Sequence, residues 1–140
     1  TDQAIADGMQ LIGEFSSSAY ASLAALELAR LAYARDEATS AQQHLRWVVD
    51  SAPDPVLSEL ARVRLGRLLL EMGDLSALQQ LLSAEPLPAF AGPIAELRGD
   101  LARVRNDPDG ARVAYAQALE AGVDDMDLLR MKLVDVGGDA

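Results

Sequence analysis

Hydrophobic residues recur every three or four positions along most of the chain, and polar or helix-breaking residues separate the stretches in which they do so. Between residues 20 and 35, for example, Leu23, Leu26 and Tyr33 mark one face of a segment rich in alanine. Such a spacing places side chains on one side of an α-helix. The sequence therefore predicts eight helices, at residues 2–14, 20–35, 38–51, 56–72, 75–84, 93–105, 108–121 and 125–136.

Short breaks group most of these helices into pairs. Gly73 marks the turn inside the second pair, whereas Pro53 and Pro86 follow the first and second pairs. Proline ends a helix because it lacks the backbone N–H and clashes with the preceding turn. The first helix, which three serines at 16–18 are expected to close, and the last helix remain single.

The third pair fits the spacing of a tetratricopeptide (TPR) repeat. That pattern asks for a small residue at repeat position 8, alanine at 20, a bulky residue at 24 and a small residue at 27. These positions are held by Gly99, Ala111, Tyr115 and Ala118. Small residues lie where the two helices of a pair approach closely, and the bulky one fills the gap to the next pair.

The other two pairs follow the pattern less closely. Ala29 and Gly66 hold position 8, so the three anchors are 37 and 33 residues apart, around the expected period of about 34. Leu78 replaces the small residue at position 20 of the second pair, which makes its second helix degenerate. We expect an all-α, TPR-like α-solenoid of about three helix pairs, with an extra N-terminal helix and a C-terminal capping helix. It would form a single domain over residues 1–140, and the alternative is an irregular helical bundle.

The composition supports a helical protein and limits the classes of molecule that it is expected to bind. The apolar half of the chain is mostly alanine and leucine, with few aromatic residues. Twenty-two acidic against twelve basic residues give a formal charge of −10, which opposes binding to nucleic acid and to anionic lipid. The absence of cysteine excludes thiol catalysis and zinc-thiolate sites.

Residues 105–110 combine acidic and amide side chains with a glycine, as calcium loops do. With Gly110 at the sixth position of an EF-hand loop, Arg105 and Ala116 fall at the first and twelfth positions and offer no side-chain oxygen. Asp107 is better suited to cap the next helix, which would begin at Pro108. We expect a turn here, and neither a metal nor a cofactor in the chain.

No group of residues typical of an enzyme is present. The single histidine, His44, has no cysteine or second histidine to act with, and the sequence has no nucleophile elbow. We interpret His44 as a surface residue and Trp47 as a core filler between pairs, with a ligand platform as the alternative for Trp47. The chain is expected not to be an enzyme.

In TPR-like solenoids, repeat positions 5, 9 and 12 of each first helix face the concave side. A groove built this way is apolar at its start and carries arginines, which suits an extended or helical peptide segment. The alternative is that some of these side chains serve packing or ion pairs. The predicted groove residues are Leu26, Arg30, Tyr33, Val63, Arg67, Leu70, Asp100 and Arg103, with Glu96 at position 5 of the third pair.

The single helices at the two ends would expose apolar faces, so end-to-end homodimerisation is a plausible consequence. No uncharged stretch approaches the ~20 residues that cross a bilayer. Because the chain starts at Thr1 and enters a helix at once, we expect it to be the soluble part of a longer protein with an N-terminal membrane anchor.

Several strings resemble the periplasmic domain of the YfgM-like family, the ancillary subunit of the SecYEG translocon, from about residue 10 onward. They are YASLAALELA (20–29), LRWVVDSAPDP (45–55), ARVRLGRLLLEMGD (61–74), ELRGD (96–100) and LLRMKLVDV (128–136). The chain departs from the family at Val134, where a second acid is usual, and at Arg35-Asp36.

The resemblance implies an inner-membrane protein whose TPR-like domain lies in the periplasm. It implies association with the translocon and with a membrane-anchored, prolyl-isomerase-like chaperone, and assistance to client segments of exported proteins. Two other interpretations remain open. One is a soluble cytosolic TPR scaffold or assembly factor with no membrane link, and the other is an enzyme with an active site inside a helical bundle.

Overall fold

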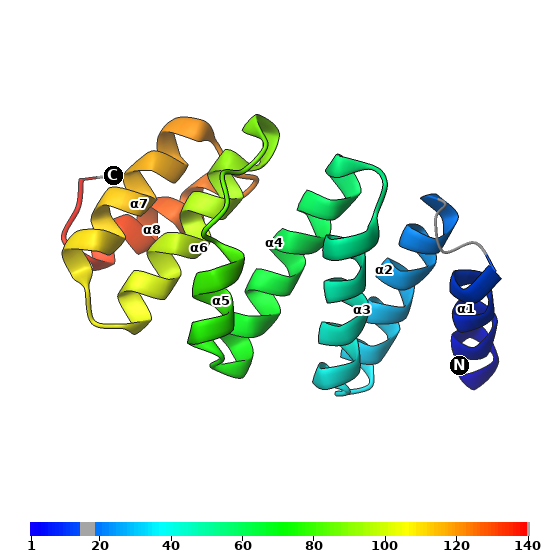
Figure 1. The fold of residues 1–140 in the computed structure, drawn as a ribbon. Helices are drawn as coiled ribbons and strands as arrows, with labels where there is room; N and C mark the ends of the chain where they lie inside the picture. The colour runs from blue at the N-terminus through cyan, green and yellow to red at the C-terminus, as the bar shows by residue number, and fades with distance from the viewer. Residues whose placement is uncertain (15–18, 140) are drawn as a thin grey trace. The chain divides into compact units, whose positions relative to one another are not determined.

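The structure is a computed structural model that describes residues 1–14 and 19–139 (Figure 1). These residues form eight α-helices and one 3-10 helix, and no strand is found among them. The predicted all-α, TPR-like fold is confirmed, while the break predicted at residues 16–18 lies outside the described residues. The helices are α1 (Asp2–Glu14), α2 (Ala19–Ala34), α3 (Ala38–Ser51), α4 (Pro55–Met72), α5 (Leu75–Leu81), η1 (Pro88–Phe90), α6 (Ala91–Val104), α7 (Pro108–Ala121) and α8 (Met126–Asp135).

The chain divides into two compact units, an N-terminal unit of residues 1–68 and a C-terminal unit of residues 69–140. In the N-terminal unit, α2 packs against α1 on one side and pairs with α3 on the other (Figure 1). Alanines fill most of the buried face of α2, including Ala25 and Ala29, and the buried residues of α3 are Ala41, Leu45 and Val48. Small side chains on α2 therefore allow its hairpin with α3 to close tightly.

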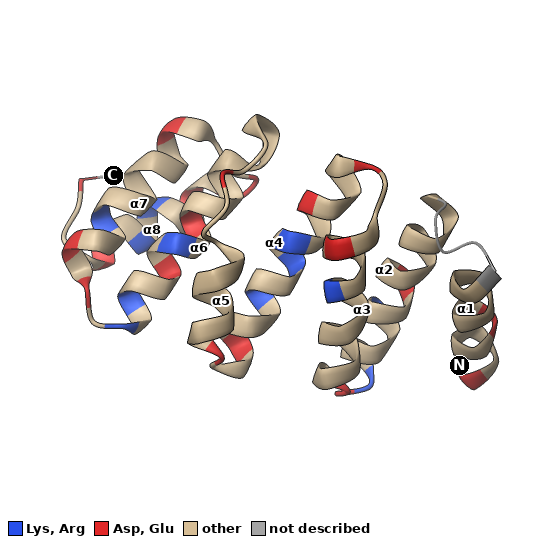
Figure 2. Ribbon diagram, in the orientation of Figure 1, with Lys and Arg blue, Asp and Glu red and all other residues tan. Residues whose placement is uncertain are grey.

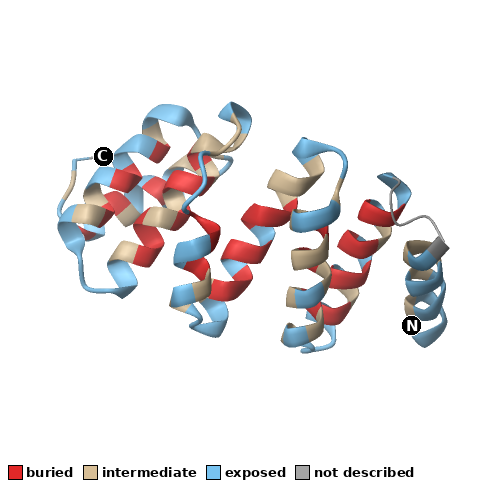
Figure 3. Ribbon diagram, viewed as in Figure 1, coloured by how far each residue is buried: buried red, intermediate tan, exposed pale blue. Residues whose placement is uncertain are grey.

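The C-terminal unit is built around the hairpin of α6 and α7, on which α8 packs (Figure 1). Its core joins one face from each of these three helices, and Figure 3 shows the buried positions running along them. The buried residues of this core are Ala95, Ala111, Tyr115, Ala118, Leu129, Leu133 and Val136. Helix α8 thus covers an apolar surface of the third pair, as expected of a capping helix.

The turns inside the three predicted pairs have the same backbone geometry. Asp36, Gly73 and Asn106 adopt positive φ angles of 59°, 77° and 60°. Each turn closes with two backbone hydrogen bonds of a Schellman motif, of which one example is Asp107 N to Ala102 O at 2.9 Å. These three residues lie seven positions after the anchors Ala29, Gly66 and Gly99. The repeat register predicted from the anchors therefore extends to the turns.

Gly99 is the anchor at which the close approach is clearest. A Cβ atom built on Gly99 would lie 2.4 Å from Cδ1 of Tyr115, a side chain that is 0% exposed. Only glycine leaves room for the tyrosine ring at this point of the α6–α7 hairpin.

Aspartates cap the N-termini of α5, α7 and α8. The side chain of Asp74 accepts a hydrogen bond from Ala77 N, that of Asp107 from Gly110 N, and that of Asp125 from Leu128 N. The cap at Asp107 confirms that the stretch around residue 107 is a helix start.

The structure differs from the predicted helices mainly between the second and third pairs. Helix α5 ends at Leu81, three residues before the predicted end, and the 3-10 helix η1 at Pro88–Phe90 was not predicted. The carbonyl oxygens of Leu82 and Ala84, which follow α5, accept hydrogen bonds from the side chain of Arg98 on α6. These bonds take the place of the backbone hydrogen bonds that a further helical turn would make. Pro88 stands at the first position of η1, where its missing N–H costs nothing.

Candidate functional site

The eight residues predicted to line a groove differ widely in exposure. Leu26, Val63 and Asp100 are 6%, 4% and 5% exposed, so they offer almost no surface to a partner. Leu70 is half-buried. The exposed members are Arg30, Tyr33, Arg67 and Arg103.

Three of the exposed members belong to the N-terminal unit. Arg30 and Tyr33 lie on α2, and Arg67 lies on α4. Arg30 is bound to Glu27 one turn earlier, with 2.5 Å between Nη2 and Oε1, and this hydrogen bond lowers the pKa of the Glu27 carboxyl. Tyr33 is 52% exposed. A tyrosine and two arginines on the surface have the composition that interface hot spots favour.

In the C-terminal unit, Asp100 belongs to a polar network that joins three helices. Its Oδ1 accepts a 2.6 Å hydrogen bond from the hydroxyl of Tyr115 on α7. Lys132 on α8 donates from Nζ to Asp100 Oδ2 at 3.2 Å and to Glu96 Oε2 at 2.9 Å. Arg103 donates from Nε to the Tyr115 hydroxyl at 3.3 Å. Asp100 therefore holds α6, α7 and α8 together.

This network also changes the acidity of Tyr115. Burial raises the pKa of Tyr115 above its usual value, and the hydrogen bond to Asp100 raises it further. The tyrosine thus stays protonated and remains a donor to the carboxylate well above neutral pH.

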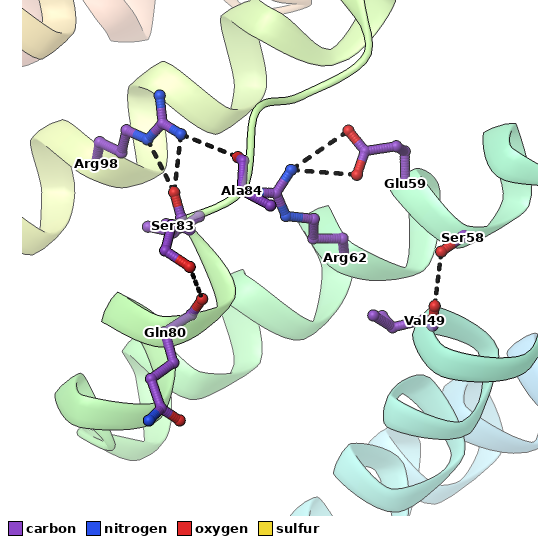
Figure 4. A network of polar contacts seen from close by, with 9 residues as sticks. Val49, Ser58, Glu59, Arg62, Gln80, Ser83, Ala84 and Arg98 are labelled. Atoms are coloured by element: carbon purple, nitrogen blue, oxygen red, sulfur yellow. Dashed lines mark hydrogen bonds and ion pairs between the residues drawn. The ribbon is translucent and has the colours of Figure 1, made fainter.

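Side chains of neighbouring helices cap three helix C-termini. Ser58 of α4 donates to Val49 O near the end of α3 at 2.7 Å, and Arg98 of α6 donates to Leu82 O at 2.8 Å and to Ala84 O at 3.2 Å (Figure 4). Arg112 of α7 donates to Val136 O after α8 at 2.8 Å. These bonds satisfy carbonyls that a helix end leaves open, and they fix where α3, α5 and α8 stop.

Charge is distributed unevenly along the chain. Residues 1–68 carry nine acidic and six basic side chains, whereas residues 69–140 carry thirteen and six (Figure 2). Among the described residues, nine of the twelve basic side chains bind another residue. The three that make no such contact there are Arg46, Arg64 and Arg67, and all three belong to the N-terminal unit.

The sequence did not identify the surface around Trp47. Trp47 is half-buried rather than enclosed in a core, and it lines an open hollow on α3 together with Arg46 and Asp50. His44 is also half-buried, in contrast to the predicted surface position, and this burial lowers the pKa of its imidazole. The signal available in the sequence was the spacing of Gln43, Arg46, Trp47 and Asp50 on one helical face.

Residues 1–14 and 19–139 lack two features, a cluster of metal-binding side chains and a membrane-spanning helix. No cluster of three or more histidine, aspartate or glutamate side chains there is arranged to hold a metal ion. No helix in this part of the chain combines the length and the apolar character needed to cross a bilayer.

Comparison with curated proteins finds relatives that share one description, ancillary SecYEG translocon subunit. The relative from Aggregatibacter actinomycetemcomitans is 26% identical over 125 residues, which is 89% of this chain and 61% of that protein. The relative from Neisseria gonorrhoeae (strain ATCC 700825 / FA 1090) is 33% identical over 96 residues, 66% of this chain and 46% of that protein. The relative from Haemophilus influenzae (strain ATCC 51907 / DSM 11121 / KW20 / Rd) is 26% identical over 125 residues, with 89% and 61% covered.

These relatives confirm the resemblance to the YfgM-like family that the sequence strings indicate. The chain spans between about half and three fifths of their length. No solved structure matches the chain. The family model of the tetratricopeptide repeat-like domain matches residues 1–138. The chain therefore belongs to the family of tetratricopeptide repeat-like domains.

Proposed function

We propose that this chain is a non-catalytic protein-interaction module that acts as an accessory subunit at the protein-export translocon. The observation that carries the proposal is the shared description of three relatives, two of which align with 89% of the chain. A helical repeat fold supports a binding role, because such folds present extended surfaces to other proteins.

Exposed side chains of the N-terminal unit are the best candidates for contacting a partner. Arg30, Tyr33 and Arg67 are exposed, and the side chain of Arg67 makes no hydrogen bond or ion pair with the described residues. An unpaired guanidinium in an acidic protein favours a partner segment that carries carboxylates. We therefore place the first contact surface on α2 and α4 of this unit.

The more detailed part of the proposal concerns location and partners. The domain would lie on the periplasmic side of the bacterial inner membrane, held there by an anchor that precedes Thr1. Its partners would be the translocon, a membrane-anchored chaperone of the prolyl-isomerase type, and client segments of exported proteins. The family resemblance supports this assignment.

A cytosolic TPR scaffold or assembly factor is the alternative. The gene sequence upstream of Thr1 separates the two. An apolar run of about 20 residues after a short basic segment favours the anchored protein. A further soluble domain without such a run favours the scaffold.

The experiment is purification of the tagged full-length protein from native membranes in mild detergent, with quantitative immunoblotting for SecY. We expect SecY to co-purify with the wild type and its recovery to fall about tenfold with a triple variant, R30A, Y33A and R67A. The matched control replaces three exposed residues of the C-terminal unit, Q117A, E120A and R130A, and should keep the wild-type recovery.

The two parts of the proposal fail in different ways. The translocon assignment would be rejected if SecY is absent from the wild-type preparation although a parallel purification of a tagged, known translocon subunit recovers SecY. Full recovery with the triple variant would reject the contact surface on α2 and α4.

A further inference from the structure

A hollow of about 450 Å³ is lined by residues of α3, within the N-terminal unit. Its volume falls in the range of small ligand sites, and its lining mixes an aromatic ring with amides and both signs of charge. We call it the α3 hollow and define it by Thr39, Gln42, Gln43, Arg46, Trp47 and Asp50.

The polar groups of the α3 hollow lack partners within the protein. The side chains of Gln42, Gln43, Arg46 and Asp50 make no hydrogen bond or ion pair with any of the described residues, nor does the indole N–H of Trp47. Arg46 and Asp50 stand one helical turn apart and yet are not paired with each other. By contrast, nine of the twelve basic side chains bind another described residue. The donors and acceptors in the hollow are therefore available to a ligand.

The repeat itself provides a comparison for this surface. The positions of α7 that correspond to Arg46 and Trp47 of α3 hold Ala116 and Gln117, both exposed. The buried residues of α3 lie at other positions, namely Ala41, Leu45 and Val48. The arginine and the tryptophan are thus not required by the repeat.

The dimensions of the hollow suit an extended chain. From Thr39 to Asp50, α3 rises by about 16 Å at about 1.5 Å per residue. An extended peptide covers that distance with about five residues at about 3.3 Å each. The amides of Gln42 and Gln43 offer both donors and acceptors, as main-chain N–H and C=O groups require.

We propose that the α3 hollow binds an extended polypeptide segment, with an apolar side chain of that segment against Trp47 and a carboxylate on Arg46. Because Arg46 is not paired with Asp50, its guanidinium is available to a carboxylate of the segment. The proposal rests on the proposed function as a protein-interaction module, and it adds a second contact face distinct from α2 and α4.

The test uses the fluorescence of Trp47, which is the only tryptophan of the chain. The protein of residues 1–140 is titrated with an acetylated and amidated heptapeptide of glycine and serine that contains one leucine and, two residues later, one glutamate. A saturable change in Trp47 emission is expected, with binding weakened by higher salt. Replacing the glutamate of the peptide by glutamine should weaken binding about tenfold, and so should R46Q.

The combination of both changes is the decisive arm. If the carboxylate binds Arg46, the glutamine peptide and R46Q together should lose no more than either change alone. The control R64Q replaces another unpaired arginine of the same unit and should bind like the wild type. Circular dichroism verifies that each variant is folded.

Three results would overturn the inference: no saturable change at millimolar peptide, equal affinity of R46Q and the wild type, or saturation by an oligosaccharide of N-acetylglucosamine in place of the peptide. The experiment is independent of SecY recovery. If the hollow binds the peptide but the protein does not recover SecY, this inference stands and the translocon assignment is rejected.

Discussion

Tyr115 on α7 donates a 2.6 Å hydrogen bond from its hydroxyl to Oδ1 of Asp100 on α6. Asp100 is only 5% exposed. The same carboxylate receives Lys132 from α8. A residue that stands at a concave position of the repeat pattern thus fastens the capping helix.

Removal of the tyrosine hydroxyl tests this link. We expect Y115F to lower the free energy of unfolding by about 1–3 kcal/mol, because the buried carboxylate loses a charge-assisted hydrogen bond. Urea denaturation followed by circular dichroism measures the change. Y20F removes a hydroxyl from a side chain that is 72% exposed and should change the stability by less than about 0.5 kcal/mol. Equal effects of the two variants would contradict the role of the network.

The stability should also depend on alkaline pH through Tyr115. Burial first, and then the hydrogen bond to Asp100, raise the pKa of Tyr115 above its usual value of 10.0. The folded protein therefore holds this proton more tightly than the unfolded chain does. The stabilising contribution is complete below pH 10 and is lost as the pH rises above it, at up to about 1.4 kcal/mol per pH unit.

The measurement for this pH effect is urea denaturation between pH 8 and pH 11 for the wild type and Y115F. The difference in unfolding free energy between the two proteins should shrink above pH 10. If the difference in unfolding free energy stays constant over this range, folding does not raise the pKa of Tyr115.

A pair of glycine substitutions tests the shared turn geometry. Gly73 has a φ of 77°, and a Cβ there would meet nothing within 4 Å, so the cost of G73A comes from the left-handed backbone alone. We expect a loss of about 1 kcal/mol. Gly13 is equally unobstructed but lies inside α1, and G13A should raise the stability by about 0.5–1 kcal/mol. Thermal unfolding of both variants distinguishes the signs, and a stabilising G73A would contradict the assigned turn.

Exposed apolar side chains on the last helix provide a test of self-association. Leu128, Met131 and Val134 of α8 are 44%, 64% and 53% exposed. If this face forms a homodimer, sedimentation velocity should show a dimer for the wild type and a monomer for M131E, since a charge at the centre of an apolar interface is costly. A wild type that remains monomeric at about 100 μM would reject the predicted homodimer.

Local signals predict most of the helices. Periodic apolar positions, prolines and the cap at Asp107 each determine the structure of residues that lie close to them in the sequence. The repeat anchors also predicted which hairpins form, and the turn residues Asp36, Gly73 and Asn106 follow them in register. The end of α5 was missed, since it depends on Arg98, which reaches back 16 residues to Leu82.

The candidate site was less predictable for the same reason. Repeat positions indicate which side chains face a common side, but burial by a later helix decides whether they remain available. Asp100 is bound by Lys132, which lies 32 residues further along the chain. Trp47 was interpreted as core, although its position in α3 lies beside the buried stripe of Leu45 and Val48 and outside it. The single-domain organisation over residues 1–140 and the groove itself remain predictions.

The repeat depends on a size match between positions 8 and 24, which are held by Gly99 and Tyr115 in the third pair and by Ala29 and Leu45 in the first. The most direct measurement is a double-mutant cycle of G99A and Y115L by urea denaturation. G99A alone should cost about 2–3 kcal/mol, because its Cβ would stand 2.4 Å from Cδ1 of Tyr115. In the double variant, which recreates the alanine and leucine of the first pair, we predict that at least about 1 kcal/mol of this loss is regained. Strictly additive losses, or a G99A variant as stable as the wild type, would contradict the repeat.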